Sequence, residues 1–178
     1  PVNTGAFATV DYKEQKVSLL GDIPSKDCAI PETVPLFKED VKVGMLYDHP
    51  NMFPEEVKAY SKFDGLVLIG SGLGHFPVDA GVDPLHGDIL SAITSLAKKK
   101  PVVMSLQTIF GKVHMNVYSP GRILQEAGVV GHGSVMSAET AFVKLAFLLS
   151  NNPVEDVKML FMQDLVGEMH GDDSNLYY

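Results

Sequence analysis

The feature that most constrains the fold is a regular alternation of short apolar runs with helix-like segments after residue 40. The apolar runs lie at Val41–Tyr47, Gly65–Ile69 and Pro101–Leu106. Between them, Pro54–Ser61 and Gly87–Lys99 have helical patterns of apolar residues. Apolar strands that alternate with helices are typical of parallel βαβ units with both faces of the sheet covered. The sequence therefore predicts an α/β domain.

The last third of the chain continues this pattern. We expect a short helix at Arg122–Glu126, then a brief strand at Val129 and Val130. Ser137 is a suitable N-cap for a helix that ends near Leu149, and Asn152 with Pro153 opens a final helix. The predicted fold is a Rossmann-like parallel sheet of about four strands, flanked by helices.

The first forty residues have a different character. Ala6–Val10 and Val17–Leu20 are predicted to form a β-hairpin around a polar turn. Asp22–Asp40 contains three prolines and many charges, which favours an extended connector. We therefore predict a boundary between a hairpin and connector at 1–40 and an α/β domain at 41–178. Since the chain starts at Pro1 without an initiator Met, we expect it to be a fragment of a longer protein.

Charge and cysteine content narrow the class of protein. The net charge is -8 and the pI is near 5.1, which disfavours direct nucleic-acid binding because that binding depends on Lys and Arg. Cys28 is the only cysteine, so the chain has no intrachain disulfide and no CxxC site. No apolar stretch approaches the length of a membrane helix. We expect a soluble, cytoplasmic protein that contacts no membrane.

The stretch Asp64–Pro77, DGLVLIGSGLGHFP, runs from an apolar strand into a glycine-rich loop. His75 stands where a dinucleotide fingerprint needs its third glycine, and no Gly-Lys-Ser/Thr follows, so both phosphate-loop templates fail. In an open α/β sheet, ligands bind beyond the carboxyl ends of the strands. Two interpretations remain open: Gly72, Gly74 and His75 form a ligand-contacting loop, or the loop is a tight turn whose histidine only satisfies backbone groups.

A second polar loop, Ser105–Arg122, should open at the same edge of the sheet. Long polar loops at this edge are often functional, although each side chain could instead satisfy the loop's own backbone. Its candidate residues are Gln107, Thr108, His114, Asn116, Tyr118 and Arg122. The six histidines show no familiar metal-ligand spacing and no GxSxG motif occurs, so we expect no metal site and no cofactor.

Three segments together carry a family resemblance: GLVLIGSGLGHFP, KPVVMSLQTIFGKVHMNVYSPGRILQEAGVV and MSAETAFVKLAFLL. Over about Val41–Leu149 the chain resembles the C-terminal domain of the L-asparaginase superfamily, and within it the D-subunit branch of archaeal glutamyl-tRNA(Gln) amidotransferases is most similar. The first forty residues then correspond to the end of a larger N-terminal domain. The stretch VDAGVDPLHGD is longer and more acidic than this family usually shows.

The resemblance implies an amidohydrolase that releases ammonia from glutamine for amidation of Glu-tRNA(Gln). Its threonine nucleophile lies in an N-terminal domain, so this chain holds no catalytic residue and is expected to be inactive alone. The implied substrate-binding residues are His75, Gly72, Gly74, Asn116 and Tyr118. The implied partners are the N-terminal domain, a second copy in a homodimer, and a tRNA-binding amidotransferase subunit, with glutamine or asparagine as substrate.

Two other functions stay open. The chain could belong to a free-standing L-asparaginase, or it could be a ligand-binding or dimerisation module without chemistry. For the isolated chain we expect self-association through an apolar face near Phe37, Phe53 and Phe76.

Overall fold

The computed structural model describes residues 6, 8–20 and 35–169. Near the N-terminus, β1 (Ala8–Asp11) and β2 (Lys16–Leu19) pair as an antiparallel hairpin, as predicted. The side chain of Asp11 closes the turn by accepting the backbone N–H groups of Lys13 and Glu14. Most of the connector predicted at Asp22–Asp40 lies outside the described residues, and the described part, from Pro35 onward, has no helix or strand.

The α/β domain is built on three parallel strands in the order β3-β4-β5, where β3 is Val43–Tyr47, β4 is Gly65–Gly70 and β5 is Val102–Leu106. Every residue of β4 and β5 is buried, which explains why these strands are apolar apart from Ser105 and show no polar alternation. The prediction of an α/β fold with a parallel sheet is confirmed.

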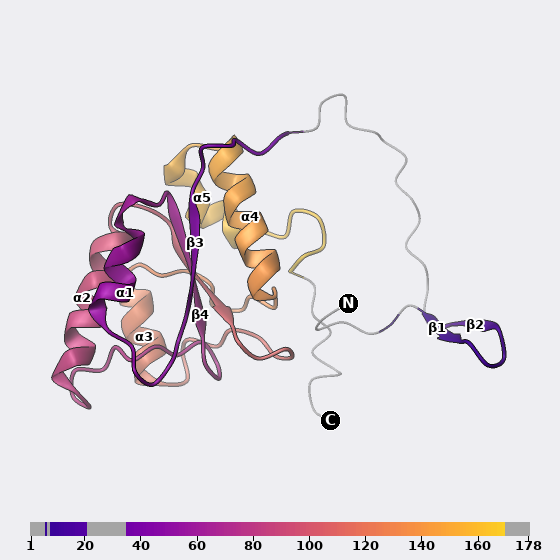
Figure 1. Cartoon of the computed structure of the whole chain (residues 1–178), viewed down its shortest axis with the longest axis horizontal. Helices are drawn as coiled ribbons and strands as arrows, with labels where there is room; N and C mark the ends of the chain where they lie inside the picture. Colours follow the sequence, from indigo (N-terminus) through magenta and orange to yellow (C-terminus); the bar gives the residue numbers. More distant parts are fainter. Residues whose placement is uncertain (1–5, 7, 21–34, 170–178) are drawn as a thin grey trace.

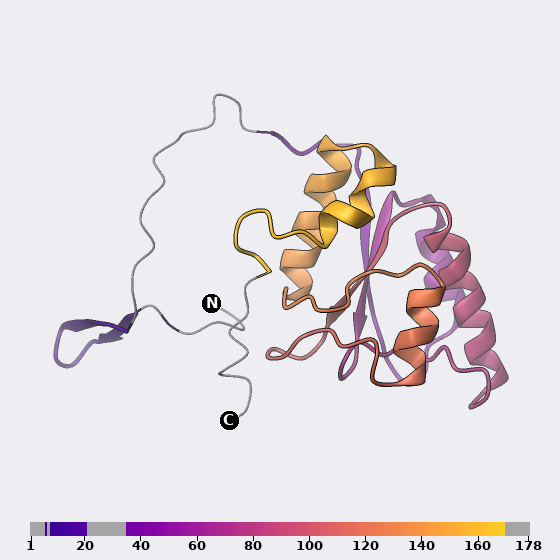
Figure 2. The same ribbon diagram turned by 180° about the vertical axis from the view of Figure 1, so that it is seen from behind.

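Two helical layers cover the sheet (Figure 1). On one face lie α1 (Pro54–Lys58), the short 3₁₀ helix η1 (Ala59–Lys62), α2 (Pro84–Ala97) and α3 (Ser119–Glu126). On the other lie α4 (Ala138–Asn151) and α5 (Val154–Phe161). Figure 2 shows the same arrangement from behind.

The side chains of β4 alternate between two hydrophobic cores. Leu66 and Leu68 belong to the core under α2, whereas Val67 and Ile69 belong to the core under α4 and α5. Successive residues of a strand point to opposite faces, so a strand between two helical layers needs an apolar residue at every position.

The predicted fourth strand at Val129 and Val130 is reduced to a single parallel bridge between Val130 and Val103. Val130 donates to Val102 O and accepts from Met104 N, but the ladder does not extend beyond this residue. The flanking Gly128 and Gly131 have φ of 91° and 144°, which turns the chain away from the strand direction. The expectation of about four strands was therefore one strand too many.

The helix ends agree with the local sequence signals. Ser137 caps α4 by accepting the backbone N–H of Thr140, and Pro153 precedes α5. α2 begins earlier than predicted, at Pro84, because the Asp83 side chain caps it by accepting the N–H of Leu85. α3 begins at Ser119, again earlier than predicted, with a proline in its first turn.

Candidate functional site

The glycine-rich loop after β4 folds back on the end of its own strand. Ser71 and His75 form an antiparallel bridge, and Ser71 O accepts the N–H groups of Gly74 and His75 at 3.0 and 2.9 Å. The loop lies beyond the carboxyl end of β4, at the edge where open α/β sheets bind ligands. Its tight geometry presents His75 directly at that edge.

Gly74 has to be a glycine for two reasons. Its φ of 101° is rarely adopted by residues with a side chain. A Cβ atom at this position would also lie 3.1 Å from Met104 Cγ and 3.2 Å from Val113 Cγ1. Gly74 is thus buried against the core, whereas Gly72, with φ of 54°, is exposed at the tip of the loop.

The structure brings His75 and Tyr118 together, although they are 43 positions apart in the chain. Their rings meet edge to face with centroids 5.1 Å apart and planes at 77°. Tyr118 is 55% exposed, while the Nε2 atom of His75 is buried and has no hydrogen-bond partner among the described residues. A buried polar atom without a partner is uncommon and calls for an explanation, such as a ligand or an ordered water.

The segment 112–118 is hydrogen-bonded to the glycine-rich loop on one side and to residues 133–134 on the other. His114 donates its N–H to Leu73 O in the glycine-rich loop at 2.9 Å. Val113 exchanges backbone hydrogen bonds with Ser134 and Gly133 on the other side. The two loops that the sequence singled out therefore form one surface, linked by backbone hydrogen bonds.

Asn116 lies in the same surface, but its polar groups are occupied by neighbouring residues. Its side chain lies 3.1 Å from His132 Nε2 and 2.8 Å from Gln125 Nε2. Its carbonyl oxygen accepts from Arg122 Nη1 at 3.0 Å. Arg122, another residue of the predicted loop, thus holds the backbone in place at the start of α3.

Gln107 and Thr108 lie just beyond the end of β5. The side chain of Gln107 donates to Asp48 O and Ile69 O, so it ties together the ends of β3 and β4. Thr108 lines a small cavity of about 170 Å³ beside Tyr47 and the start of α4.

The acidic stretch VDAGVDPLHGD packs against α3 through Asp79. Its Oδ2 accepts from the Ser119 hydroxyl, next to Tyr118, and its carbonyl oxygen lies 3.2 Å from His86 Nδ1. This stretch also provides Asp83, the N-cap of α2. This acidic stretch therefore supports the Tyr118 side of the site.

His132 was not predicted from the sequence. Its Nδ1 accepts the backbone N–H of Met115 at 3.1 Å, and its ring lies 5.0 Å from that of His114. No spacing rule would have identified it, because it reaches the loop from a turn that follows the single-residue bridge at Val130. Within the described part of the chain, no three His, Cys, Asp or Glu residues form a group that could hold a metal ion.

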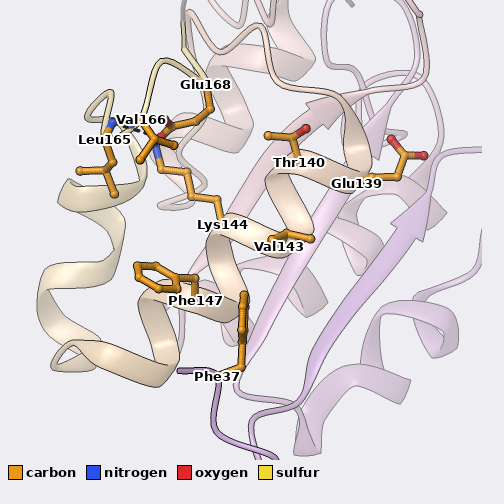
Figure 3. Close-up of a pocket in the computed structure, with 9 residues that line it drawn as sticks. All are labelled: Phe37, Glu139, Thr140, Val143, Lys144, Phe147, Leu165, Val166 and Glu168. Carbon is orange, nitrogen blue, oxygen red and sulfur yellow. Dashed lines mark hydrogen bonds and ion pairs between the residues drawn. The ribbon is translucent and has the colours of Figure 1, made fainter. Parts of the chain in front are cut away.

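A separate apolar groove of about 450 Å³ lies on the outer face of α4 (Figure 3). Of its four polar residues, Lys144 and Glu168 are paired with each other at 2.5 Å, and Glu139 and Thr140 also line the groove. The other five lining residues are apolar. Such a surface suits protein packing better than recognition of a polar amino acid. The apolar residues that line it are Phe37, Val143, Phe147, Leu165 and Val166.

Only part of the predicted apolar face is exposed. Phe37 is 54% exposed at this groove and Phe53 is half-exposed at the start of α1, but Phe76 is buried in the core under α2. The prediction for Phe76 was wrong because the glycine-rich loop folds back and carries the residue after His75 inward. Among the described residues, no helix combines the length and hydropathy needed to cross a membrane.

Comparison with known proteins places these features in context. The model of the Glutaminase/Asparaginase C-terminal domain matches residues 42–161. The D-subunit of glutamyl-tRNA(Gln) amidotransferase from Methanococcus maripaludis (strain C7) is 36% identical over 175 residues, covering 95% of this chain and 39% of that protein. The corresponding protein of Saccharolobus solfataricus is 33% identical over 175 residues, with 95% and 36% covered.

Solved structures agree. The thermostable L-asparaginase from Thermococcus kodakarensis superimposes with a TM-score of 0.73 and 27% identity, covering 96% of this chain and 49% of that one. L-asparaginase I from Vibrio cholerae gives a TM-score of 0.73 and 26% identity, with 87% and 46% covered. The chain thus spans about 39% of the length of the first curated relative and just under half of these solved chains.

Proposed function

This chain belongs to the Glutaminase/Asparaginase C-terminal domain family, and we propose that it is the C-terminal part of an amidohydrolase subunit that releases ammonia from glutamine. The ammonia is used to amidate Glu-tRNA(Gln) on a partner subunit that holds the tRNA. The names of the relatives, which are glutamyl-tRNA(Gln) amidotransferase subunits, support this choice of substrate and partner. The observation that carries the proposal is the His75–Tyr118 pair with its unsatisfied ring nitrogen.

In this proposal His75 and Tyr118 contact the substrate. The Nε2 atom of His75 has no partner to lose among the described residues, and in this proposal the exposed Tyr118 ring moves so that the buried nitrogen binds the α-ammonium or α-carboxylate group of an amino acid. The exposed backbone at Gly72 lets the substrate approach closely, and the buried Gly74 holds the loop on the core. Asn116 orders the loop in this proposal, because its side chain already faces His132 and Gln125.

The nucleophile lies outside this chain in our proposal. The Thr94 hydroxyl donates to Leu90 O within α2, and the Thr140 hydroxyl lies 3.2 Å from the capping hydroxyl of Ser137. Neither has the adjacent base that activates a threonine nucleophile. We therefore expect no ammonia release from glutamine or asparagine by this chain alone, and ammonia release above a contaminant control would contradict this.

For assembly we propose an N-terminal asparaginase domain within the same polypeptide and a homodimer in which this half completes the substrate site of the neighbouring subunit. The groove on α4 is the surface that we assign to the N-terminal domain. The segment that enters the α/β domain lies along this groove: Asn151 donates to Leu36 O, and Phe37 packs edge to face on Phe147 at 5.7 Å. Residues 36 and 37, which precede the α/β domain, thus lie next to the groove.

The experiment is the His75→Ala substitution in the full-length protein with its partner subunit. Loss of one oriented hydrogen bond to a charged group should lower kcat/KM for glutamine about tenfold, which corresponds to ~1.4 kcal/mol. The melting temperature should barely change, because the Nε2 atom has no protein partner to lose. His49→Ala is the matched control, since this histidine pairs with Glu56 at α1 and not with the His75 or Tyr118 ring.

If His75→Ala lowers the melting temperature and leaves the kinetics unaltered, the histidine serves the turn alone and the substrate role is wrong. A free-standing L-asparaginase is the second candidate, favoured by the structural match to two L-asparaginases. Measuring asparagine and glutamine turnover with and without Glu-tRNA(Gln) separates the two candidates. Turnover that prefers asparagine and ignores the tRNA would favour the asparaginase.

A further inference from the structure

His132 uses both of its ring nitrogens on two consecutive residues of one loop. Nδ1 accepts the backbone N–H of Met115, and Nε2 lies 3.1 Å from the side-chain amide of Asn116. The ring comes from a segment whose backbone is itself paired to this loop through Val113 and Ser134. The His132 segment and the 115–116 segment are therefore both held in place by other interactions, and the His132 ring links the two.

Only one form of the ring satisfies both contacts. Since Nδ1 accepts a hydrogen bond from Met115, a neutral ring carries its proton on Nε2. Nε2–H then donates to the carboxamide oxygen of Asn116 when the Asn116 and Gln125 carboxamides are both turned by 180°. The Asn116 NH₂ then donates to the Gln125 oxygen, and each turned amide has the same shape as before. The imidazolium ion has N–H groups on both nitrogens, so it would set two donors against each other at Met115.

The loop that His132 holds is the one that presents Tyr118 to His75. Tyr118 follows Asn116 by two residues, and Arg122 fixes the intervening backbone by donating to Asn116 O and Val117 O. We infer that His132 is a positioning residue whose neutral ring holds the 115–118 loop so that Tyr118 faces His75, and whose protonation releases that loop. The inference extends the proposed function, because Tyr118 and His75 are there assigned to the substrate.

The ionisable neighbours of this contact are a second histidine and an arginine. The titratable group against the ring is His114, whose centroid lies 5.0 Å away and whose Nδ1 is buried without a partner among the described residues. The Arg122 guanidinium donates to the carbonyl oxygen of Asn116, the residue whose side chain the ring contacts. Neither is an anion that would stabilise an imidazolium ion.

The first test is NMR of this chain and does not depend on catalysis. In labelled protein the His132 ring should show the Nε2–H tautomer near pH 8. As the pH falls through the range in which imidazoles titrate, the Met115 amide signal should shift as its hydrogen bond is lost. His132→Asn, whose side-chain oxygen can still accept that N–H, should abolish the shift, whereas His49→Asn should leave it intact.

The second test uses the full-length protein with its partner subunit. His132→Phe, which keeps a ring but removes the acceptor, should raise KM for glutamine about fivefold at pH 8, equivalent to ~1 kcal/mol, with a smaller effect on kcat. His132→Asn should restore KM and flatten its rise at acidic pH. An Nδ1–H tautomer, or a Met115 amide that does not titrate with His132, would overturn the inference even if His132→Phe failed to fold. If the NMR results hold but no glutamine turnover is found, it is the proposed function that fails.

Discussion

The buried ion pair between Lys144 and Glu168 allows the most quantitative prediction. The Lys144 Nζ and Glu168 Oε1 atoms are 2.5 Å apart, and the two side chains are only 5% and 10% exposed. Lys144 also donates to Gln163 O, and the carboxylate accepts the N–H groups of Leu165 and Val166. The pair therefore fastens the segment after α5 to α4 (Figure 3).

The perturbation is removal of one or both partners. Lys144→Met leaves a buried carboxylate without its cation, which should cost about 3–5 kcal/mol of unfolding free energy. The double variant Lys144→Met with Glu168→Leu removes both charges and replaces them with apolar groups of similar size. It should recover most of that loss, because the cost of burying two charged groups disappears with the pair.

The pH dependence of the unfolding free energy gives a second, independent estimate of how much the ion pair stabilises the fold. Burial raises the pKa of Glu168, but the hydrogen bonds from Lys144 and from the backbone outweigh it and lower the pKa from 4.5 to about 2. The unfolded chain therefore binds this proton more readily than the folded chain. The stabilisation is fully present above pH 4.5 and is lost as the pH falls towards 2, with about 2 kcal/mol already lost at pH 3.

The assay is urea denaturation followed by circular dichroism at pH 7 and pH 3 for the wild type, Lys144→Met and the double variant. Between these two pH values, the wild type should lose about 2 kcal/mol more stability than the double variant. All other carboxylates are common to both proteins, so they cancel in this comparison. Equal losses in the two proteins, or a Lys144→Met cost below ~1 kcal/mol as for a surface pair, would refute the reasoning.

Three further predictions concern stability and association. Gly74→Ala should lower the unfolding free energy by about 2–3 kcal/mol, because the cost of a positive φ and the cost of crowding the core add together. Gly133→Ala, with φ of 88° but no atom within 4 Å of its Cβ, should cost only about 1 kcal/mol. Equal losses of stability in chemical denaturation of the two variants would show that packing at Gly74 does not matter. Ser137→Ala should remove the α4 cap and cost about 1 kcal/mol, while Ser137→Asp should keep most of it in thermal unfolding; no difference between the two variants would contradict the capping role. Phe37→Ser should weaken self-association of the isolated chain in analytical ultracentrifugation, because it removes an exposed ring from the groove; a wild-type chain that stays monomeric at high concentration would contradict the expectation.

Much of the fold could be predicted because its signals are local. The strands β4 and β5 are buried at every position and are apolar except for Ser105, and a run of this kind has few alternatives to burial between two layers. Ser137, Pro153 and the spacing of Ile89, Ile93 and Leu96 likewise mark helices through contacts within a few residues. The fourth strand failed because two valines have a strong strand preference, whereas the glycines on either side decide how far the strand continues.

The family and the glycine-rich loop were also predicted from the sequence. The match over residues 42–161 confirms the family. The substrate roles of His75, Gly72, Gly74, Asn116 and Tyr118 stay predictions. What the sequence alone determined is that His75 follows a buried parallel strand through a turn rich in glycine. A residue that directly follows a parallel strand lies at the carboxyl end of that strand, so His75 lies at the edge of the sheet where ligands bind.

Only the tertiary structure decided which distant side chains meet at that edge. His75 faces Tyr118, Asn116 faces His132 and Gln125, and Phe76 turns into the core. These contacts depend on how the loops after β4 and β5 are fastened to each other and to the turn after Val130. The hydrogen bonds between these loops run largely between backbone groups. Every residue other than proline has the same backbone donor and acceptor, so the identity of the side chains does not indicate which residues these bonds will join.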